Sequence, residues 1–373
     1  MQNSTIIKLF AVLIVLIFLA VAVLNFLKLN APETAETAPT SAKSENYSAP
    51  YKPFVPKAVK PQSDSDDADS DEKEAPKLPR DKVEAWLAKH NRNAMSLLAA
   101  FRSSGDTNYL NEAATNFPND PHVELSVLAH DEFPADRRKW LDLFKQSSPS
   151  NSLANYLSAQ DDFKNGKNDD AVQELLAASG KSQFDNFAME NELDAEELYS
   201  ASGKSPIETT SFAMSDMSEE NMPELVALRE VAKGIADSEK QYIDSGDANS
   251  AVNLAQMGMT LANQLQNGDS GKDLINQLVG VAEENIVLSK LDQNTSYDFL
   301  DGQTPAQISD QLKQQTIQLV QITKAFGDIT PDLTDAEKIS FRQREIIFGE
   351  TAAMQWAVQQ HPVPTYPLPT SQQ

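Results

Sequence analysis

The sequence predicts an all-α fold. Apolar residues recur every three to four positions within helix-length segments, and prolines, asparagines, aspartates and glycines separate these segments. Only 13 glycines occur in 373 residues, so tight turns between paired strands are scarce. No stretch combines strand-like alternation with β-branched enrichment and flanking turn residues. We therefore expect helices throughout the folded part of the chain.

The first element is a predicted transmembrane anchor in residues 1–28. From Ile6 to Leu27 only Lys8 and Asn25 are polar. Twenty-two helical residues extend about 33 Å at about 1.5 Å each, and a bilayer core is about 30 Å thick. Ala20-Val21-Ala22 offers the alternative of a cleaved signal peptide, but the apolar run continues beyond it. We expect an uncleaved, single-pass anchor through residues 6–27.

Residues 29–80 are predicted to be a disordered linker. They hold eight of the 20 prolines and no glycine, which leaves too few apolar residues for a core. The linker ends in an acidic run, 64–74, with seven acids and one base. An anchor followed by this stalk is typical of a bacterial envelope protein, and we expect an inner-membrane protein whose body lies in the periplasm.

From residue 81 onward the pattern predicts a helical body. We expect a first lobe at 81–180, a joint of short helices and irregular segments at 181–218, a second lobe at 219–360, and an extended, proline-rich tail at 361–373. One helix should run from Asp81 to Gly105. The further helices are expected at 107–116, 121–130, 135–146, 151–165, 168–179, 223–244, 248–267, 272–291, 304–326 and 334–360. A single curved stack with a looser joint is the alternative to two lobes.

Three segments share a spacing of aromatic residue, turn glycine and small or apolar residue. They are Phe101-x3-Gly105-x4-Leu110, Phe163-x2-Gly166-x4-Ala171 and Tyr242-x3-Gly246-x4-Ala251. The glycine allows the chain to reverse, and the small residue lets the second helix pack closely. This pattern resembles the tetratricopeptide-type helical hairpin repeat, mainly over residues 81–180. The resemblance implies a stack of hairpins whose concave face binds a peptide or another protein.

Composition excludes several kinds of chemistry. The chain has no cysteine, which removes disulfides, thiolate metal sites and cysteine nucleophiles. Its net charge of −24 argues against a nucleic-acid partner. The four histidines lack the spacing of a zinc site, and the Gly-Lys-Ser triplets at 180–182 and 203–205 lack the upstream glycine of a phosphate loop. We expect no cofactor, no metal and no catalytic residue that the sequence can identify.

One basic and aromatic cluster is the candidate binding site. Arg137, Arg138 and Lys139 form the strongest basic group in an acidic body, directly before Trp140 and Phe144. Together they could hold an acidic, apolar segment of a partner, although Trp140 and Phe144 could equally belong to a hairpin core. The final helix also carries more apolar residues than one core face needs, which permits ordinary packing, a terminal cap or self-association.

These observations predict a membrane-tethered, non-enzymatic protein that binds or scaffolds a protein or peptide partner. The alternative from another class is an envelope enzyme, a hydrolase acting on carbohydrate or peptide through carboxylates that the sequence does not single out. A pocket with clustered acids would favour that alternative. A third interpretation is a self-assembling structural element.

Overall fold

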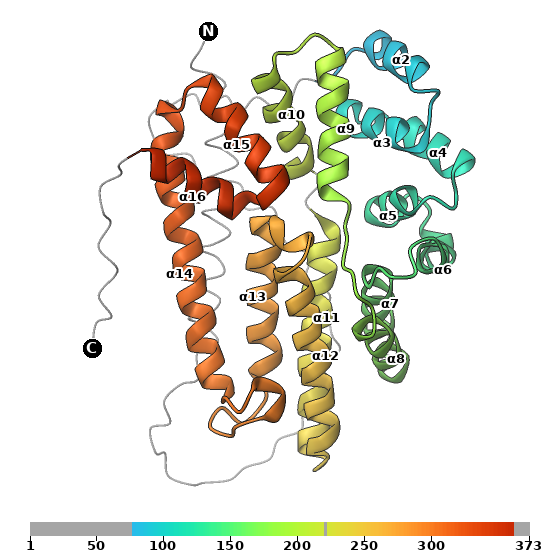
Figure 1. Cartoon of the computed structure of the whole chain (residues 1–373). Helices are drawn as coiled ribbons and strands as arrows, with labels where there is room; N and C mark the ends of the chain where they lie inside the picture. Colours follow the sequence, from blue (N-terminus) through green and yellow to red (C-terminus); the bar gives the residue numbers. More distant parts are fainter. Residues whose placement is uncertain (1–76, 220–221, 362–373) are drawn as a thin grey trace, which may run out of the picture.

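The computed structural model describes residues 77–219 and 222–361, and within these ranges every regular element is helical (Figure 1). The all-α prediction is confirmed. The N-terminal half contains α2 (Arg80–Lys89), α3 (Ala94–Ser104), α4 (Thr107–Asn116), α5 (Pro121–His130), α6 (Arg137–Ser147), α7 (Leu153–Lys164), α8 (Asn168–Ser179), α9 (Ala188–Ala201) and α10 (Pro206–Glu219). The C-terminal half contains α11 (Pro223–Asp244), α12 (Ala248–Gln266), α13 (Leu274–Leu288), α14 (Pro305–Ile329), α15 (Asp335–Phe348) and α16 (Glu350–Gln360).

The three predicted hairpin turns are present. Gly105, Gly166 and Gly246 all adopt positive φ angles, between 68° and 82°. Each turn joins two helices that pack against each other, α3 with α4, α7 with α8 and α11 with α12. The fifth residue after each glycine is buried, as close packing of the second helix requires. These residues are Leu110, Ala171 and Ala251.

Two expected helices are each broken into a pair. The predicted helix from Asp81 to Gly105 is interrupted because Asn91 and Arg92 take positive φ angles, and Asn93 then caps α3 by accepting a hydrogen bond from the Ser96 backbone. The predicted helix at 334–360 breaks at Gly349, whose φ of 90° separates α15 from α16. A Cβ at Gly349 would lie 2.9 Å from the Cα of Lys272, so this turn also needs glycine for space.

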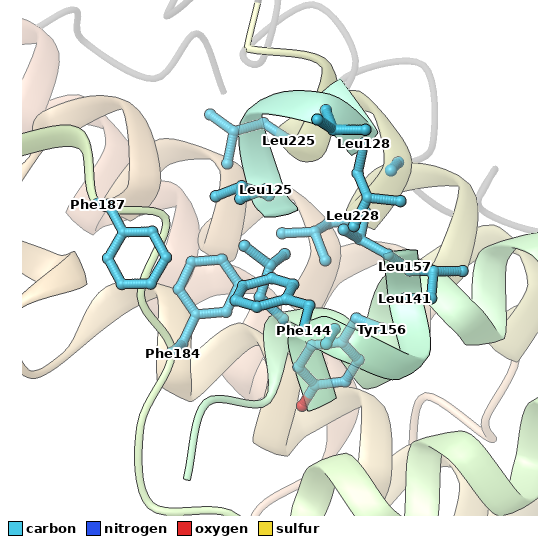
Figure 2. Close-up of a cluster of buried hydrophobic side chains, with 14 of the residues drawn as sticks. Leu125, Leu128, Leu141, Phe144, Tyr156, Leu157, Phe184, Phe187, Leu225 and Leu228 are labelled. Atoms are coloured by element: carbon cyan, nitrogen blue, oxygen red, sulfur yellow. The ribbon is translucent and has the colours of Figure 1, made fainter. Parts of the chain in front are cut away.

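The N-terminal helices and the long C-terminal helices share one core. In Figure 1 the short helices α2–α8 lie along one side of the upright helices α11–α13. Figure 2 shows leucines of α5, α6 and α7 meeting Leu225 and Leu228 of α11, with Phe184 and Phe187 from the segment before α9. A single cluster of buried side chains extends from Leu78 to Leu300. One core cluster therefore includes residues of both predicted lobes.

Residues 181–218, for which the sequence predicted an irregular joint, consist mainly of the helices α9 and α10. These helices form a hairpin of their own, and α9 also packs against α2 and α3. Their apolar residues are few, and Ala195, Leu198 and Tyr199 supply most of the buried face of α9. That narrow stripe explains why the helical pattern was weak in the sequence.

A second, smaller core lies at the other end of the chain. It brings Leu274 and Leu278 of α13 together with residues of α14, α15 and α16, among them Phe326, Phe341 and Met354. The rings of Phe326 and Phe341 stack with centroids 4.6 Å apart. This core holds α15 across the end of α14, and α15 also contacts α10.

None of the helices within 77–219 and 222–361 combines the length and the apolar character that a bilayer crossing requires. The predicted membrane segment, residues 6–27, lies outside the described residues. So do residues 29–76 of the predicted linker and residues 362–373 of the predicted tail.

Candidate functional site: a cavity with a buried ion cluster

A cavity of about 440 Å³ opens between the α9–α10 hairpin on one side and α14–α15 on the other. This volume falls in the range of about 300–1,000 Å³ that is usual for ligand pockets. Its walls are mainly apolar. They include Leu193 of α9, Ile207 and Met214 of α10, Phe326 of α14, Leu333, and Ile339, Phe341 and Ile346 of α15.

A single arginine, Arg342 of α15, lies on the cavity wall and is bound by three carboxylates. Its Nη2 atom is 2.9 Å from Oε2 of Glu192, and its Nε donates to Oε1 of Glu196 at 2.8 Å. Its Nη1 donates to Oε2 of Glu345 at 2.9 Å. The Arg342 side chain is only 7% exposed, so these contacts form largely away from water. Because two of the carboxylates come from α9, the cluster joins α15 to the N-terminal half of the chain.

Two further acidic residues, Asp273 and Glu350, lie near these groups. Asp273 precedes α13, and Glu350 begins α16, where its Oε2 accepts a hydrogen bond from the Leu274 backbone. Burial, with a smaller contribution from the charge on Glu345, raises the pKa of Asp273 to about 7 and the pKa of Glu350 to about 8. We call these two residues, together with Arg342, Glu192, Glu196 and Glu345, the Arg342 cluster.

The cluster contains more acid than base, and Glu192, Glu345, Asp273 and Glu350 have pKa values raised by burial. Burial raises the pKa of Glu192 to about 8, despite the opposing charge of Arg342. Burial also raises the pKa of Glu345. Five carboxyl groups surround one guanidinium, so part of the cluster is protonated at neutral pH. Such a site can take up a positive charge by releasing a proton.

Exposed apolar side chains mark the mouth of the cavity and the end of α15. Leu193 and Ile339 line the cavity, yet they are 38% and 41% exposed. At the C-terminal end of α15, Ile347 and Phe348 are 61% and 66% exposed. The sequence had shown an apolar excess in this region. In the structure, Ile347 and Phe348 lie outside the core, whereas Phe341 and Met354 are part of the core.

The residues predicted to bind a partner lie elsewhere. Trp140 and Phe144 are buried on α6, at 5% and 0% exposure. Arg137 pairs with Asp161 at 2.9 Å and also donates to the Leu128 backbone. Arg138 lies near three acids on α6, α7 and α8, and the Lys139 ammonium stands 5.8 Å from the Trp140 ring centre. The structure thus keeps the five residues together, with both aromatic rings turned into the core.

Arg342 and its partners were not among the residues predicted from the sequence. A signal was available: Glu192 and Glu196 are four residues apart on one helix, and Arg342 and Glu345 are three apart on another, so each pair shares a helix face. In a chain with 55 acids this spacing occurs many times by composition alone. Only the packing of α9 beside α15 distinguishes these residues from the others.

Among the described residues, no set of three or more histidine or acidic side chains is arranged to hold a metal ion. Comparison of the chain with family models, with curated proteins and with solved structures gave no match.

Proposed function

We propose that this chain is a non-enzymatic binding protein whose cavity between α9–α10 and α14–α15 receives an apolar segment of a protein or peptide partner. One observation carries this proposal. The cavity is walled by apolar side chains and open to the surface, and Leu193 and Ile339 remain partly exposed at its mouth. Apolar side chains that stay in contact with water beside a cavity gain stability when a partner covers them.

The helical-hairpin body would present this cavity as a scaffold. The proposal keeps the expectation that residues 6–27 anchor the chain in a membrane and that residues 29–80 form the tether. A tether raises the effective concentration of the body for partners at the same membrane. The body carries 45 acids and 22 bases over residues 81–373, so anionic headgroups would repel it from the bilayer surface.

Site-specific photocrosslinking tests this function. A photoreactive amino acid replaces Ile339 at the cavity mouth in the full chain, within the cells that produce it. The control carries the same amino acid in place of Leu176, which is 53% exposed on α8. We expect a discrete protein adduct from position 339 that disappears when Leu193→Asp is added, and none of that size from position 176. Equal adducts from both positions, or none from position 339, would overturn the proposal.

A second function is favoured by one observation. Glu196 and Glu345 face the same cavity, and burial raises the pKa of Glu345, which is the direction that a general acid requires. The chain could then be a hydrolase of carbohydrate or peptide. The test compares hydrolysis of mixed oligosaccharide and peptide substrates by the native protein and by Glu345→Gln. Hydrolysis that the variant loses would support this function, and the absence of turnover in both proteins would remove it.

Self-assembly remains a third proposal because Ile347 and Phe348 are exposed side by side. Sedimentation of the full chain over a range of concentrations checks it. A mass that rises with concentration, and falls back in Ile347→Ser/Phe348→Ser, would support assembly through this end of α15. A constant monomer mass would remove it.

A further inference from the structure

The cavity has more acidic than basic side chains on otherwise apolar walls. Glu196, Glu197 and Glu345 line it, together with the cations Arg342 and Lys338. Glu192 adds a fourth carboxylate directly behind Arg342, at 2.9 Å. A charge is solvated poorly among apolar walls, so the sign of the surrounding groups decides which ligand charge the site accepts.

Arg342 cannot easily attract an anion here. Its Nε and Nη1 donate hydrogen bonds to Glu196 and Glu345, and its Nη2 lies 2.9 Å from an oxygen of Glu192 without a hydrogen bond, so a carboxylate already stands at each of the three nitrogens. An anion would have to displace one of these glutamates and would then lie beside the other two. A cation would find carboxylate oxygens from both sides of the cavity.

The shape of the site favours a helical occupant. Recognition by strand addition needs an exposed sheet edge, and no strand occurs in residues 77–219 or 222–361. Recognition of a proline-rich segment needs an aromatic groove, whereas the two phenylalanines on this wall, Phe326 and Phe341, stack on each other in the core. The remaining mode is an amphipathic helix that lies across the cavity mouth and inserts its side chains between α9, α10, α14 and α15.

We infer that the partner segment is a basic amphipathic helix, which places a lysine or arginine among Glu196, Glu197 and Glu345 and its apolar side chains on Leu193 and Ile339. This inference rests on the proposed binding function and names the chemistry of the partner. The acidic side chains of the cavity favour a basic residue in the partner by charge complementarity. The partly exposed Leu193 and Ile339 favour apolar residues next to that basic residue.

Binding of this helix is coupled to proton release. The groups facing Glu345 are Arg342 on α15, Glu192 and Glu196 on α9, Asp273 before α13 and Glu350 on α16. The raised pKa values of Glu192 and Glu345 mean that the cluster holds protons that an incoming cation drives off. Affinity for a basic helix therefore increases from pH 6 to pH 8, while lysine and arginine stay charged.

The test is a selection from displayed amphipathic helices. All library members share one apolar face, and their polar positions are randomised. The target is the full chain in nanodiscs of zwitterionic lipid, and empty nanodiscs remove clones that bind lipid. We expect bound clones to be enriched in lysine or arginine next to the apolar face. Their affinity should fall by about tenfold when that residue becomes glutamine, equivalent to about 1.4 kcal/mol.

Matched variants locate the contact. Glu197→Gln removes a carboxylate whose side chain is 59% exposed and which pairs with His90 at 2.9 Å. It should weaken the basic clones without affecting a clone in which the basic residue is glutamine. Glu230→Gln is the control, because Glu230 also loses an ion pair, with Lys233 in its own helix α11, and this variant should change neither affinity. Far-ultraviolet circular dichroism checks that each variant keeps its helices.

The outcomes separate the inference from the function on which it rests. Bound clones without basic enrichment, or with acidic enrichment, would overturn the inference and leave the binding function in place. No bound clones at all would overturn both. A third outcome would also overturn the inference. If basic clones bound equally to the Glu197→Gln and native proteins, and bound more weakly at pH 8 than at pH 6, the contact would lie outside the cavity.

Discussion

The Nε of Arg342 on α15 donates a hydrogen bond to the Oε1 of Glu196 on α9, at 2.8 Å and across 146 residues of sequence. This contact joins an element near the C-terminus to one that packs on the N-terminal helices. The cavity exists only where these two helices face each other. The ion cluster that gives the site its charge is therefore also part of what holds the site together.

Substitution of Arg342 should destabilise the protein strongly. Arg342→Met leaves Glu192, Glu196 and Glu345 without their cation in a buried setting, which typically costs about 3–5 kcal/mol. Urea unfolding followed by circular dichroism measures this loss. Arg138→Met is the control, because that side chain is 59% exposed and its surface ion pairs should contribute less than about 1 kcal/mol. Equal losses in the two variants would contradict the expectation.

Stability should fall as pH rises from about 5 to about 9. Burial raises the pKa of Glu239 to about 9 and holds that of Glu283 well above its usual value of 4.5. No oxygen of either carboxyl has a hydrogen-bond partner within the described parts of the chain. An acid that binds its proton more tightly when folded stabilises the fold below its unfolded pKa and loses that contribution as pH rises through the folded pKa.

Urea unfolding of Glu239→Gln across this pH range checks the assignment. Between pH 5.5 and pH 8 the variant should lose stability with pH more slowly than the native protein, by up to about 1.4 kcal/mol per pH unit. Glu230→Gln, which changes an exposed acid on the same helix, should keep the native slope. If the Glu239→Gln slope were also native, ionisation of Glu239 would not be the cause.

Gly258 should not tolerate alanine. A Cβ built on Gly258 of α12 would lie 2.5 Å from a methyl carbon of Val287 on α13. Overpacking of this kind costs about 1–3 kcal/mol, which exceeds the gain of about 1 kcal/mol from replacing a helical glycine by alanine. Thermal unfolding should thus show a lower midpoint for Gly258→Ala.

Gly180→Ala provides the comparison for that substitution. Gly180 has a φ of −82°, and its nearest contact for an added Cβ is a backbone oxygen at 3.8 Å. We expect this variant to be as stable as the native protein or slightly more so, because alanine restricts the unfolded chain. A lower midpoint at both positions would indicate that the close contact with Val287 is not responsible.

Ile339→Ser should weaken binding without weakening the fold. Its side chain is 41% exposed at the cavity mouth, so its loss should change the free energy of unfolding by less than about 0.5 kcal/mol. The affinity for a selected helix should fall by about tenfold, as expected when an apolar contact of about 1.4 kcal/mol is removed. Leu176→Ser, on α8, should leave affinity unchanged in the same fluorescence titration.

Much of the fold could be predicted from local sequence signals. The bounds of α4, α5, α8 and α11 agree with their predicted ranges. A proline, asparagine, aspartate or glycine lies at each end of these helices or directly beside it, around a clear apolar stripe. The two missed breaks, at Asn91 and Gly349, differ in cause. Asn91 lies in the polar run 89–93, where Asn93 was a local signal for a helix N-cap. Gly349 lies between apolar residues on both sides, and its close approach to Lys272 is a tertiary contact that the sequence does not show.

The cavity could not be predicted in the same way. Its walls come from two helix pairs, α9–α10 and α14–α15. The lining residues of the first pair end at Met214 and those of the second begin at Phe326, more than a hundred residues later, and no local pattern shows that they meet. The sequence drew attention instead to Arg137, Arg138, Lys139, Trp140 and Phe144, where charge and aromatic residues are dense over a short range. In the structure both of those rings lie in the core, and the guanidinium groups of Arg137 and Arg138 lie beside acids of neighbouring helices.

The core drawn in Figure 2 has a consequence for how the body unfolds. Leu125 of α5 and Leu228 of α11 belong to one buried cluster, so opening either half exposes apolar surface of the other to water. Heating should then melt the two halves in a single cooperative transition, seen as one peak in calorimetry.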